Sequence, residues 1–551
     1  MLTGNLDSLR TVTRYWGALL LVFVAGWLIQ GCRQEKGPLV LDDGTPVSGD
    51  TFIQGSIGEP NTLLPVLASD SASSEINSLV YNGLVRYDKN FVPEGELAES
   101  WQISPDNLTI TFKLRKGVTW HDGAPFTSAD VMFTYRLYID PDTPTAYAED
   151  YLQVVKAEAP DDYTFRVTYA EPYAPALLSW GVSIHPKHLL EGETLAETPL
   201  ARSPIGTGPY VFKRWDAREK LVLEANPDYF EGAPHIKRVV YRIIPDQSTM
   251  FLELKSGSLD FMGLTPLQYD RQTDTVAFKR RYNKYRYLAF GYTYLGYNLR
   301  RPLFQDKRIR QALAYAINKN EIVDGVLLGY GSRATGPYKP DTWVYNPQVR
   351  RYDYNPQKAR ELLAEAGWVD QDADGYLERD GKPFTFTIIT NQGNDLRSKT
   401  GEIIQRRLKE IGIDVKLRII EWASFLNEFV FPGDFDALIL GWTGGPEPDQ
   451  YDIWHSSKTE PRQLNFIAYK NQEVDELLEK GRRIFDQDER KQVYDRFQEI
   501  LAEEQPYTFL YVSEALPVVA RRFRGIEEAP AGIRYNFIDW YVPKEEQKYA
   551  R

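Results

Sequence analysis

Three aspartates recur at alternate positions in the segment Asp370-Gln-Asp372-Ala-Asp374-Gly375. The first half of an EF-hand loop presents carboxylates to Ca²⁺ with this spacing. An EF-hand also needs a bidentate Glu at its twelfth position, and Gly381 stands there. We therefore expect a solvated acidic hairpin turn, with weak calcium binding as the minor alternative.

Other patterns that could support chemistry are incomplete. His185 and His188 could share a metal from one helix face, but Pro186 lies between them and no acidic partner is evident. The sequence has no HExxH, no phosphate-binding P-loop and no GxSxG nucleophile elbow. We expect no catalytic residue, no metal site and no cofactor, and therefore a protein that is not an enzyme.

The chain contains a single cysteine, Cys32, and it follows an apolar run. Arg10 and Arg14 precede Trp16–Ile29, an uncharged and mostly apolar stretch that is too short for a spanning helix. This order is typical of a secretory signal, and the sequence before Cys32 is similar to a bacterial lipobox. The pattern predicts that Cys32 becomes the lipidated first residue of the mature protein.

The predicted processing divides the amino-terminal end into two parts. Residues 1–31 form the lipoprotein signal peptide, and the polar, Gly- and Pro-containing residues 32–50 form a tether. The body is then anchored to a membrane through Cys32. We expect it in the periplasm or on the outer face of the cytoplasmic membrane.

The composition predicts a large folded body with an acidic surface. The 551 residues are 42% hydrophobic and 26% charged, which excludes a disordered chain. Their net charge of −12 argues against a nucleic-acid partner. Aromatic residues make up 13%, enough for both a core and an aromatic binding cleft.

Strand and helix patterns alternate along the body, which is typical of an α/β fold. Residues 108–114 alternate apolar and polar side chains as a half-buried strand does, and Ser128 is expected to cap a helix over 128–137. Asn355 and Pro356 begin a helix that ends at Gly367. Further strands are predicted at 384–389, 414–420 and 437–440, and further helices at 306–328, with a break near 318, and within 472–504.

Three long stretches carry a resemblance to a known family. They are LVYNGLVRYD at 79–88 with the segment 111–136, then GTGPY at 206–210 with ANPDYF at 225–230, and PLFQDKRIRQAL at 302–313. In this order they resemble the extracellular solute-binding proteins of the peptide and nickel class, family 5, which are receptors of ABC importers. The resemblance spans nearly the whole mature chain.

The resemblance implies a two-lobed clamp of the periplasmic-binding-protein type with an extra domain inserted in the first lobe. The first lobe would comprise residues 51–69, 186–297 and 514–545, and the extra domain 70–185. The second lobe would comprise 298–513. Hinge strands would cross near Tyr297-Asn298 and near 510–513, and the ligand would bind between the lobes.

The resemblance also implies cleft residues. Glu59 matches a ligand-facing position in the first turn, although that turn could equally be structural. Trp442, Thr443 and Gly444 match a segment whose next residue is an Asp that binds the ligand's α-ammonium in peptide receptors; here Gly445 stands in its place. Glu447 or Asp449 could substitute from a shifted position. Tyr511 would lie in the second hinge, presented to the ligand or packed in the hinge.

The sequence is compatible with several functions. The leading expectation is a monomeric, lipid-anchored receptor that captures oligopeptides and delivers them to an ABC permease and ATPase complex. A receptor for another solute, such as an oligosaccharide, is the alternative within the family, and scarce His and Cys disfavour nickel. A peptide chaperone or signalling receptor comes next, and an exported hydrolase last.

Overall fold

A computed structural model describes residues 45–549 of the chain. The predicted signal segment 1–31, Cys32 and most of the predicted tether lie outside the described residues. The tether is shorter than expected at its end, because strand β1 (Gly49–Ser56) already begins at Gly49 and Asp50 is buried. Within 45–549, no helix combines the length and apolar character needed to cross a membrane.

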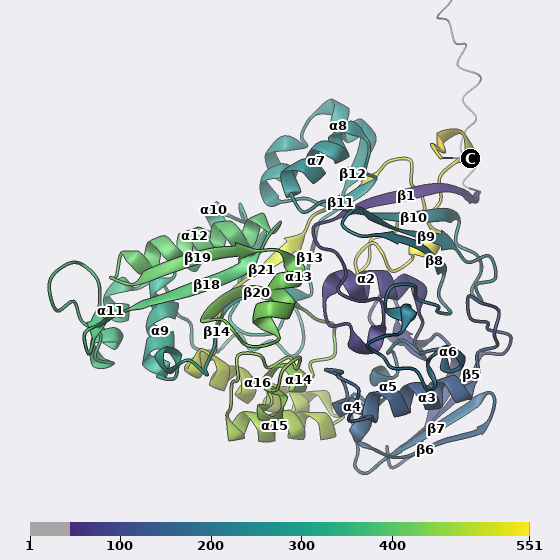
Figure 1. The fold of residues 1–551 in the computed structure, drawn as a ribbon, viewed down its shortest axis with the longest axis horizontal. Coiled ribbons are helices and arrows are strands. Elements are labelled where there is room, and N and C mark those ends of the chain that lie inside the picture. The colour runs from purple at the N-terminus through teal and green to yellow at the C-terminus, as the bar shows by residue number, and fades with distance from the viewer. Residues whose placement is uncertain (1–44, 550–551) are drawn as a thin grey trace, which may run out of the picture. The chain divides into compact units, whose positions relative to one another are not determined.

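Two large mixed sheets organise the body (Figure 1). In the first, β1 pairs in parallel with β10 and β11, and antiparallel strands extend the sheet on both sides. Its order is β12-β22-β11-β1-β10-β9-β8. The remaining strands of this sheet are β8 (Tyr210–Asp216), β9 (Lys220–Ala225), β10 (Ile236–Ile243), β11 (Phe261–Gly263), β12 (Tyr282–Lys284) and β22 (Pro517–Ala520).

The second sheet has the order β13-β21-β14-β20-β18-β19, with β15 paired to β21. Here β18 pairs in parallel with β19 and β20, whereas β14 pairs antiparallel with β20 and β21. Its strands are β13 (Tyr287–Leu288), β14 (Gly291–Tyr297), β15 (Gly331–Arg333), β18 (Thr385–Asn391), β19 (Asp414–Ile420), β20 (Ala437–Thr443) and β21 (Tyr507–Ala515). The small hairpin β16 (Glu378–Arg379) and β17 (Lys382–Pro383) lies outside it.

Helices cover both sheets with apolar stripes. The first sheet and α2 (Ser71–Val80) share a core with α7 (Gln247–Ser256) and α8 (Val276–Arg281). Two cores flank the second sheet, and between them they bury the apolar faces of its major helices. These helices are α9 (Lys307–Ala316), α10 (Lys319–Gly325), α11 (Pro356–Glu365), α12 (Asp395–Lys409), α14 (Tyr451–Trp454), α15 (Gln472–Arg483) and α16 (Gln487–Glu504).

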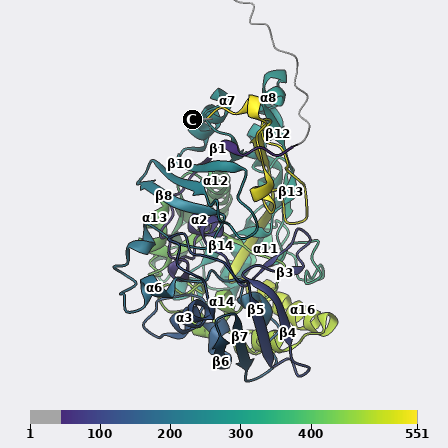
Figure 2. The same ribbon diagram turned by 90° about the vertical axis from the view of Figure 1, so that its right-hand side faces the viewer.

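A four-stranded antiparallel sheet forms a third layer with its own core. Its order is β4-β5-β7-β6, and both views place it beside α3 (Ser128–Ile139), away from the first sheet (Figure 2). Its strands and short helices are β4 (Ala98–Ile103), β5 (Thr109–Leu114), β6 (Val154–Asp161), β7 (Thr164–Tyr169), α4 (Glu149–Leu152), α5 (Ala176–Ser179) and α6 (Lys187–Leu190); a hairpin of β2 (Val85–Tyr87) and β3 (Pro93–Gly95) adjoins it.

Local sequence signals account for most helix starts. The Asn355 side chain caps α11 by accepting from Lys358 N, as expected. For α3 the cap is Thr127 rather than Ser128, because Thr127 and Asp130 form a reciprocal capping box. The expected break near 318 separates α9 from α10, and Asn318 caps the second helix.

The packing differs from the expected domain bounds at four places. Strand β14, placed in the first lobe by the resemblance, pairs within the second sheet, so the chain crosses at 285–286 rather than at 297–298. It returns at 516, between β21 and β22, rather than at 510–513. Helix α2 packs with the first sheet, and the core of the four-stranded sheet extends to Leu200. Strand pairing and core membership depend on distant segments, which local patterns do not specify.

A buried arginine links the first and the last strand, in chain order, of the first sheet. The Arg522 guanidinium contacts Asp50, bonds Asp260 Oδ2 at 2.7 Å and donates to Thr51 O at 2.9 Å. Asp50 also accepts from the backbone N–H groups of Lys548 and Tyr549. The cluster therefore links the start of β1 to the chain that follows β22.

We expect Arg522→Met to lower the free energy of unfolding by about 3–5 kcal/mol, because it leaves two buried carboxylates without their cation. Urea denaturation followed by fluorescence measures this change. The matched control is Arg238→Met, which breaks the exposed pair with Glu224 in the same sheet and should cost less than about 1 kcal/mol. Equal losses of unfolding free energy in both variants would contradict the role of Arg522 as the cation of a buried ionic cluster.

Candidate functional site

A pocket lies where β20 ends beside β14. The segment 442–445 lines it together with Tyr292 from β14 and the loop around Tyr338. Two polar atoms of this lining, Tyr292 Oη and Gln450 Oε1, are buried without a hydrogen-bond partner among the described residues. Buried polar groups are nearly always paired, so a ligand or a water that reached these two atoms would satisfy them. The full lining is Phe290, Gly291, Tyr292, Pro337, Tyr338, Lys339, Thr342, Val344, Trp442, Thr443, Gly444, Gly445, Pro446, Glu447, Pro448, Gln450 and Ile453.

Trp442 forms one wall of this pocket. Its half-buried ring stacks on Phe466, with centroids 5.6 Å apart and planes 26° apart. The indole Nε1 donates to Tyr507 Oη at 3.4 Å. These contacts fix the ring from behind while leaving part of it exposed, as expected for a flat apolar wall.

The turn after Trp442 leaves open space. Thr443 pairs with Gly291 at the end of the ladder, and Gly444 N donates to Phe290 O at 3.0 Å. A Cβ added at Gly444 or Gly445 would meet no heavy atom within 4 Å. A ligand main chain could therefore approach this turn closely.

The two acids that could have replaced the missing carboxylate at Gly445 already have cationic partners. Glu447 contacts Arg490, and Asp449 Oδ2 lies 2.7 Å from Arg482 Nη2. Burial raises the pKa of the Glu447 carboxyl, and Arg490 opposes that rise. Neither carboxylate is left to bind a ligand ammonium by itself.

Glu59 and Tyr511 lie apart from this pocket. Glu59 Oε1 accepts from Trp215 Nε1 at 2.7 Å and from Arg218 N at 3.1 Å, so its position on the first lobe is held by internal bonds. Tyr511 is 1% exposed and packs in the core on the other face of the second sheet. The structure therefore favours packing over ligand contact for Tyr511.

Arg397 is a candidate that sequence reasoning missed. Its Nη1 donates to Asn391 Oδ1 at 2.8 Å, while its buried Nε has no partner among residues 45–549, and no carboxylate lies within ion-pair distance in that range. Removal from water lowers the pKa of this guanidinium. The sequence did offer one signal for this site. Arg397 lies in the first turn of α12, where the helix dipole favours acidic residues and disfavours a cation.

Segments of the first lobe also contact the second lobe directly. Asn427 Nδ2 donates to Asn61 Oδ1 at 3.0 Å. A Cβ on Gly58 would lie 3.1 Å from the Trp422 ring, and one on Gly393 would lie 2.4 Å from Pro245 O. The two lobes are thus in close contact at the turn that contains Glu59.

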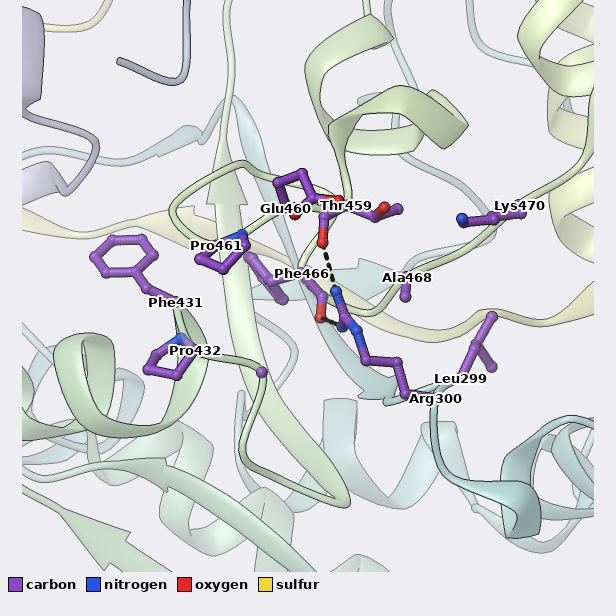
Figure 3. Close-up of a pocket in the computed structure, with 11 residues that line it drawn as sticks. Leu299, Arg300, Phe431, Pro432, Thr459, Glu460, Pro461, Phe466, Ala468 and Lys470 are labelled. Carbon is purple, nitrogen blue, oxygen red and sulfur yellow. Dashed lines mark hydrogen bonds between the residues drawn. The ribbon is translucent and has the colours of Figure 1, made fainter. Parts of the chain in front are cut away.

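A second cavity of about 490 Å³ lies behind Phe466 (Figure 3). Arg300 Nη1 donates to Phe466 O at 2.8 Å, and its Nη2 donates to Thr459 O at 2.5 Å. These bonds fix the loop that contains Phe466, on which the Trp442 ring stacks. The cavity contains none of the residues predicted for the cleft. Its lining is Leu299, Arg300, Phe431, Pro432, Gly433, Thr459, Glu460, Pro461, Phe466, Ala468 and Lys470.

The acidic turn and the histidine pair have structural partners. Asp370, Asp372 and Asp374 accept backbone N–H bonds within the exposed turn that leads into β16. Their carboxylates and that of Glu378 lie within 4.8 Å of one another. His185 is buried and accepts from Val66 N, whereas His188 bonds Asp122 Oδ2 at 2.7 Å. The two histidines therefore do not share a site.

Comparison with known proteins assigns this chain to a protein family. The model of bacterial extracellular solute-binding proteins, family 5 (Middle), matches residues 92–463. The chain belongs to this family. Family 5 proteins are solute-binding receptors rather than enzymes, and their fold is the mixed α/β fold of periplasmic binding proteins.

Individual relatives are similar over almost the whole chain. The oligopeptide-binding protein AppA of Bacillus subtilis is 36% identical over 93% of this chain and 95% of its own length. The structure of AppA with a nonapeptide has a TM-score of 0.87 at 35% identity, covering 91% of this chain and all of AppA. NikZ from Campylobacter jejuni in complex with Ni(L-His) has a TM-score of 0.81 at 28% identity, covering 90% of this chain and all of NikZ.

For this family 5 protein we expect Trp442→Ala to weaken ligand binding at least tenfold while lowering the free energy of unfolding by only about 1–2 kcal/mol. The Trp442 side chain is only partly buried, so its removal costs less than that of a fully buried aromatic. Titration with a degenerate nonapeptide pool and urea denaturation measure the two effects. Loss of stability with unchanged affinity would assign Trp442 to the core.

Proposed function

We propose that this chain is a lipid-anchored, monomeric receptor that captures oligopeptides between two lobes and delivers them to an ABC permease and ATPase complex. Cys32 would carry the anchor. The first lobe would comprise about 49–83, 206–284 and 517–549, the extra domain 84–205, and the second lobe 287–515. Family membership and the likeness to AppA, whose structure holds a nonapeptide, support this proposal.

The observation that carries the peptide assignment is the pairing of an aromatic wall with an open, glycine-containing turn. Trp442 offers a flat apolar face, and Gly444-Gly445 allow close approach of a ligand main chain. Tyr292 Oη and Gln450 Oε1 are one donor and one acceptor without internal partners. Such a site would hold a peptide backbone and leave the ligand side chains in less specific surroundings.

Charge in this region favours the carboxyl end of a peptide over its amino end. Gly445 supplies no acid, and Glu447 and Asp449 are occupied by arginines. Arg397 does not line the pocket but lies beside Gly441 of β20, and its Nε has no hydrogen-bond partner among the described residues. We infer that a ligand carboxylate pairs with Arg397 and that a free α-ammonium contributes little.

Native mass spectrometry of the full chain, extracted from cells in mild detergent, tests the cargo. We expect co-purified peptides of mixed sequence at a ratio of one per chain, without cleavage products accumulating over time. Bound glycans or metal–amino-acid complexes in place of peptides would overturn the peptide assignment. Turnover of an added nonapeptide pool would overturn the receptor assignment.

Gly445→Asp should create a preference for a free amino terminus. The new carboxylate enters open space, so it can pair with an α-ammonium at little packing cost. We expect free nonapeptides to bind about fivefold tighter than their N-acetylated forms, ~1 kcal/mol for a partly exposed ion pair. The original chain should bind both pools equally.

Gly444→Asp is the matched control for this change. A Cβ at Gly444 also meets no atom within 4 Å, but the new carboxylate starts from the neighbouring residue and so occupies a different position. It adds the same charge, so general electrostatic attraction would appear in both variants. A preference for free amino termini in the original chain, or in Gly444→Asp alone, would contradict the proposed orientation.

A further inference from the structure

A buried ionic cluster joins the extra domain to the second lobe. Arg482, near the end of α15, lies 2.7 Å from Asp449 of its own lobe and 3.2 Å from Asp150 on α4. Lys458 Nζ lies 3.1 Å from Glu149, also on α4, and 3.5 Å from Asp452 on α14. Each cation thus has one partner on each side of the contact. Figure 1 shows α4 next to α14 and α15.

The cluster is shielded from water. The side chains of Arg482 and Lys458 are 6% and 7% exposed. The Arg482 guanidinium lies 3.9 Å from the centre of the Tyr451 ring, and Arg482 O accepts from Ala174 N of the extra domain at 2.6 Å. Charge interactions here are therefore stronger than those of surface pairs.

Its position makes the cluster sensitive to lobe movement. The extra domain is inserted in the first lobe, and the described chain passes between the two large sheets at 285–286 and at 516. Bending at these crossings moves α4 relative to α14 and α15. Opening therefore separates Asp150 from Arg482 and Glu149 from Lys458, while Arg482–Asp449 and Lys458–Asp452 stay within one lobe.

The cluster holds more acids than cations. Four carboxylates, Glu149, Asp150, Asp449 and Asp452, surround Arg482 and Lys458. Asp452 Oδ1 is buried and has no hydrogen-bond partner among the described residues. Other titratable groups nearby are Tyr147, Tyr173, Tyr451, His455, Glu479, Asp70 and the Glu447–Arg490 pair.

The excess of carboxylates over cations favours protonation of the buried carboxyl groups. Burial, followed by repulsion from Asp150, raises the pKa of Asp452 to about 7. Burial also raises the pKa of Asp150, and Arg482 opposes that rise. Separation of the lobes removes the repulsion between these two carboxylates and returns them to water.

We propose that closure of the second lobe onto the extra domain assembles an ionic latch that takes up a proton at Asp452. The closed form holds the proton because four carboxylates then share two buried cations, whereas the open form releases it. Closure is thereby linked to pH, independently of which solute the receptor carries.

The direction of the pH effect on closure follows from the direction in which the pKa of Asp452 is shifted. The pKa of Asp452 is raised in the closed form, so the closed form binds more protons than the open form between about pH 4 and 7. Lowering the pH through this range favours closure, and raising it favours opening. The closed-to-open ratio should change by up to about tenfold per pH unit between pH 5 and 7, and little above pH 8.

Double electron–electron resonance between two spin labels tests the pH dependence of closure without any ligand. Labels at Lys156→Cys on β6 and Lys399→Cys on α12, in the full chain with Cys32→Ser, report the separation of the extra domain and the second lobe. We expect the short-distance population to fall as the pH rises from 5 to 7. Since no ligand is used, failure of this test leaves the proposed receptor function untouched.

Asp452→Asn should abolish most of this pH dependence, because the amide has the same shape and does not titrate. Asp495→Asn is the control, since that carboxylate pairs with Lys491 within α16 and lies outside the cluster; it should keep the original slope. A pH-independent distance distribution in the parent, or an unchanged slope in Asp452→Asn, would overturn the proton-coupled latch.

Discussion

The described chain passes between the two large sheets twice, at 285–286 and at 516, and this constraint governs the rest of the architecture. Each sheet buries its own apolar faces, so neither depends on the other for its core. Within the first sheet, Arg522 ties β1 to the chain after β22. Two rigid bodies joined by short connections can change their relative position without unfolding either one.

Contacts across the lobes include polar and ionic pairs beside aromatic contacts such as Phe91–Phe290 and Tyr269–Tyr330, whereas contacts within each lobe are mainly apolar. The Asn61–Asn427 bond and the cluster around Arg482 illustrate the polar and ionic pairs. Ionic contacts of this type can be exchanged for water at modest net cost, because desolvation offsets much of their attraction. A lobe interface built from them favours reversible closure, as ligand capture by a two-lobed receptor requires.

Local signals predicted the elements well and their assembly less well. The capped start of α11, the break between α9 and α10, and the strands predicted at 414–420 and 437–440 follow from spacing and cap residues that act over a few positions, although β20 continues to Thr443. The ligand-binding residues stay a prediction. Trp442, Thr443, Gly444 and Gly445 line one pocket, whereas Tyr511 packs in a core and Glu59 is held by Trp215.

The sequence by itself determined the α/β class and the family, because long ordered motifs and periodic patterns are local properties of the chain. It also determined that Gly445 brings no carboxylate to the pocket. Only the tertiary structure decided which charges remain available. Arg490 and Arg482 reach Glu447 and Asp449 from 43 and 33 residues away, while Arg397 reaches no acid within the described residues. Charge compensation depends on distance in space, and separation along the chain does not specify it.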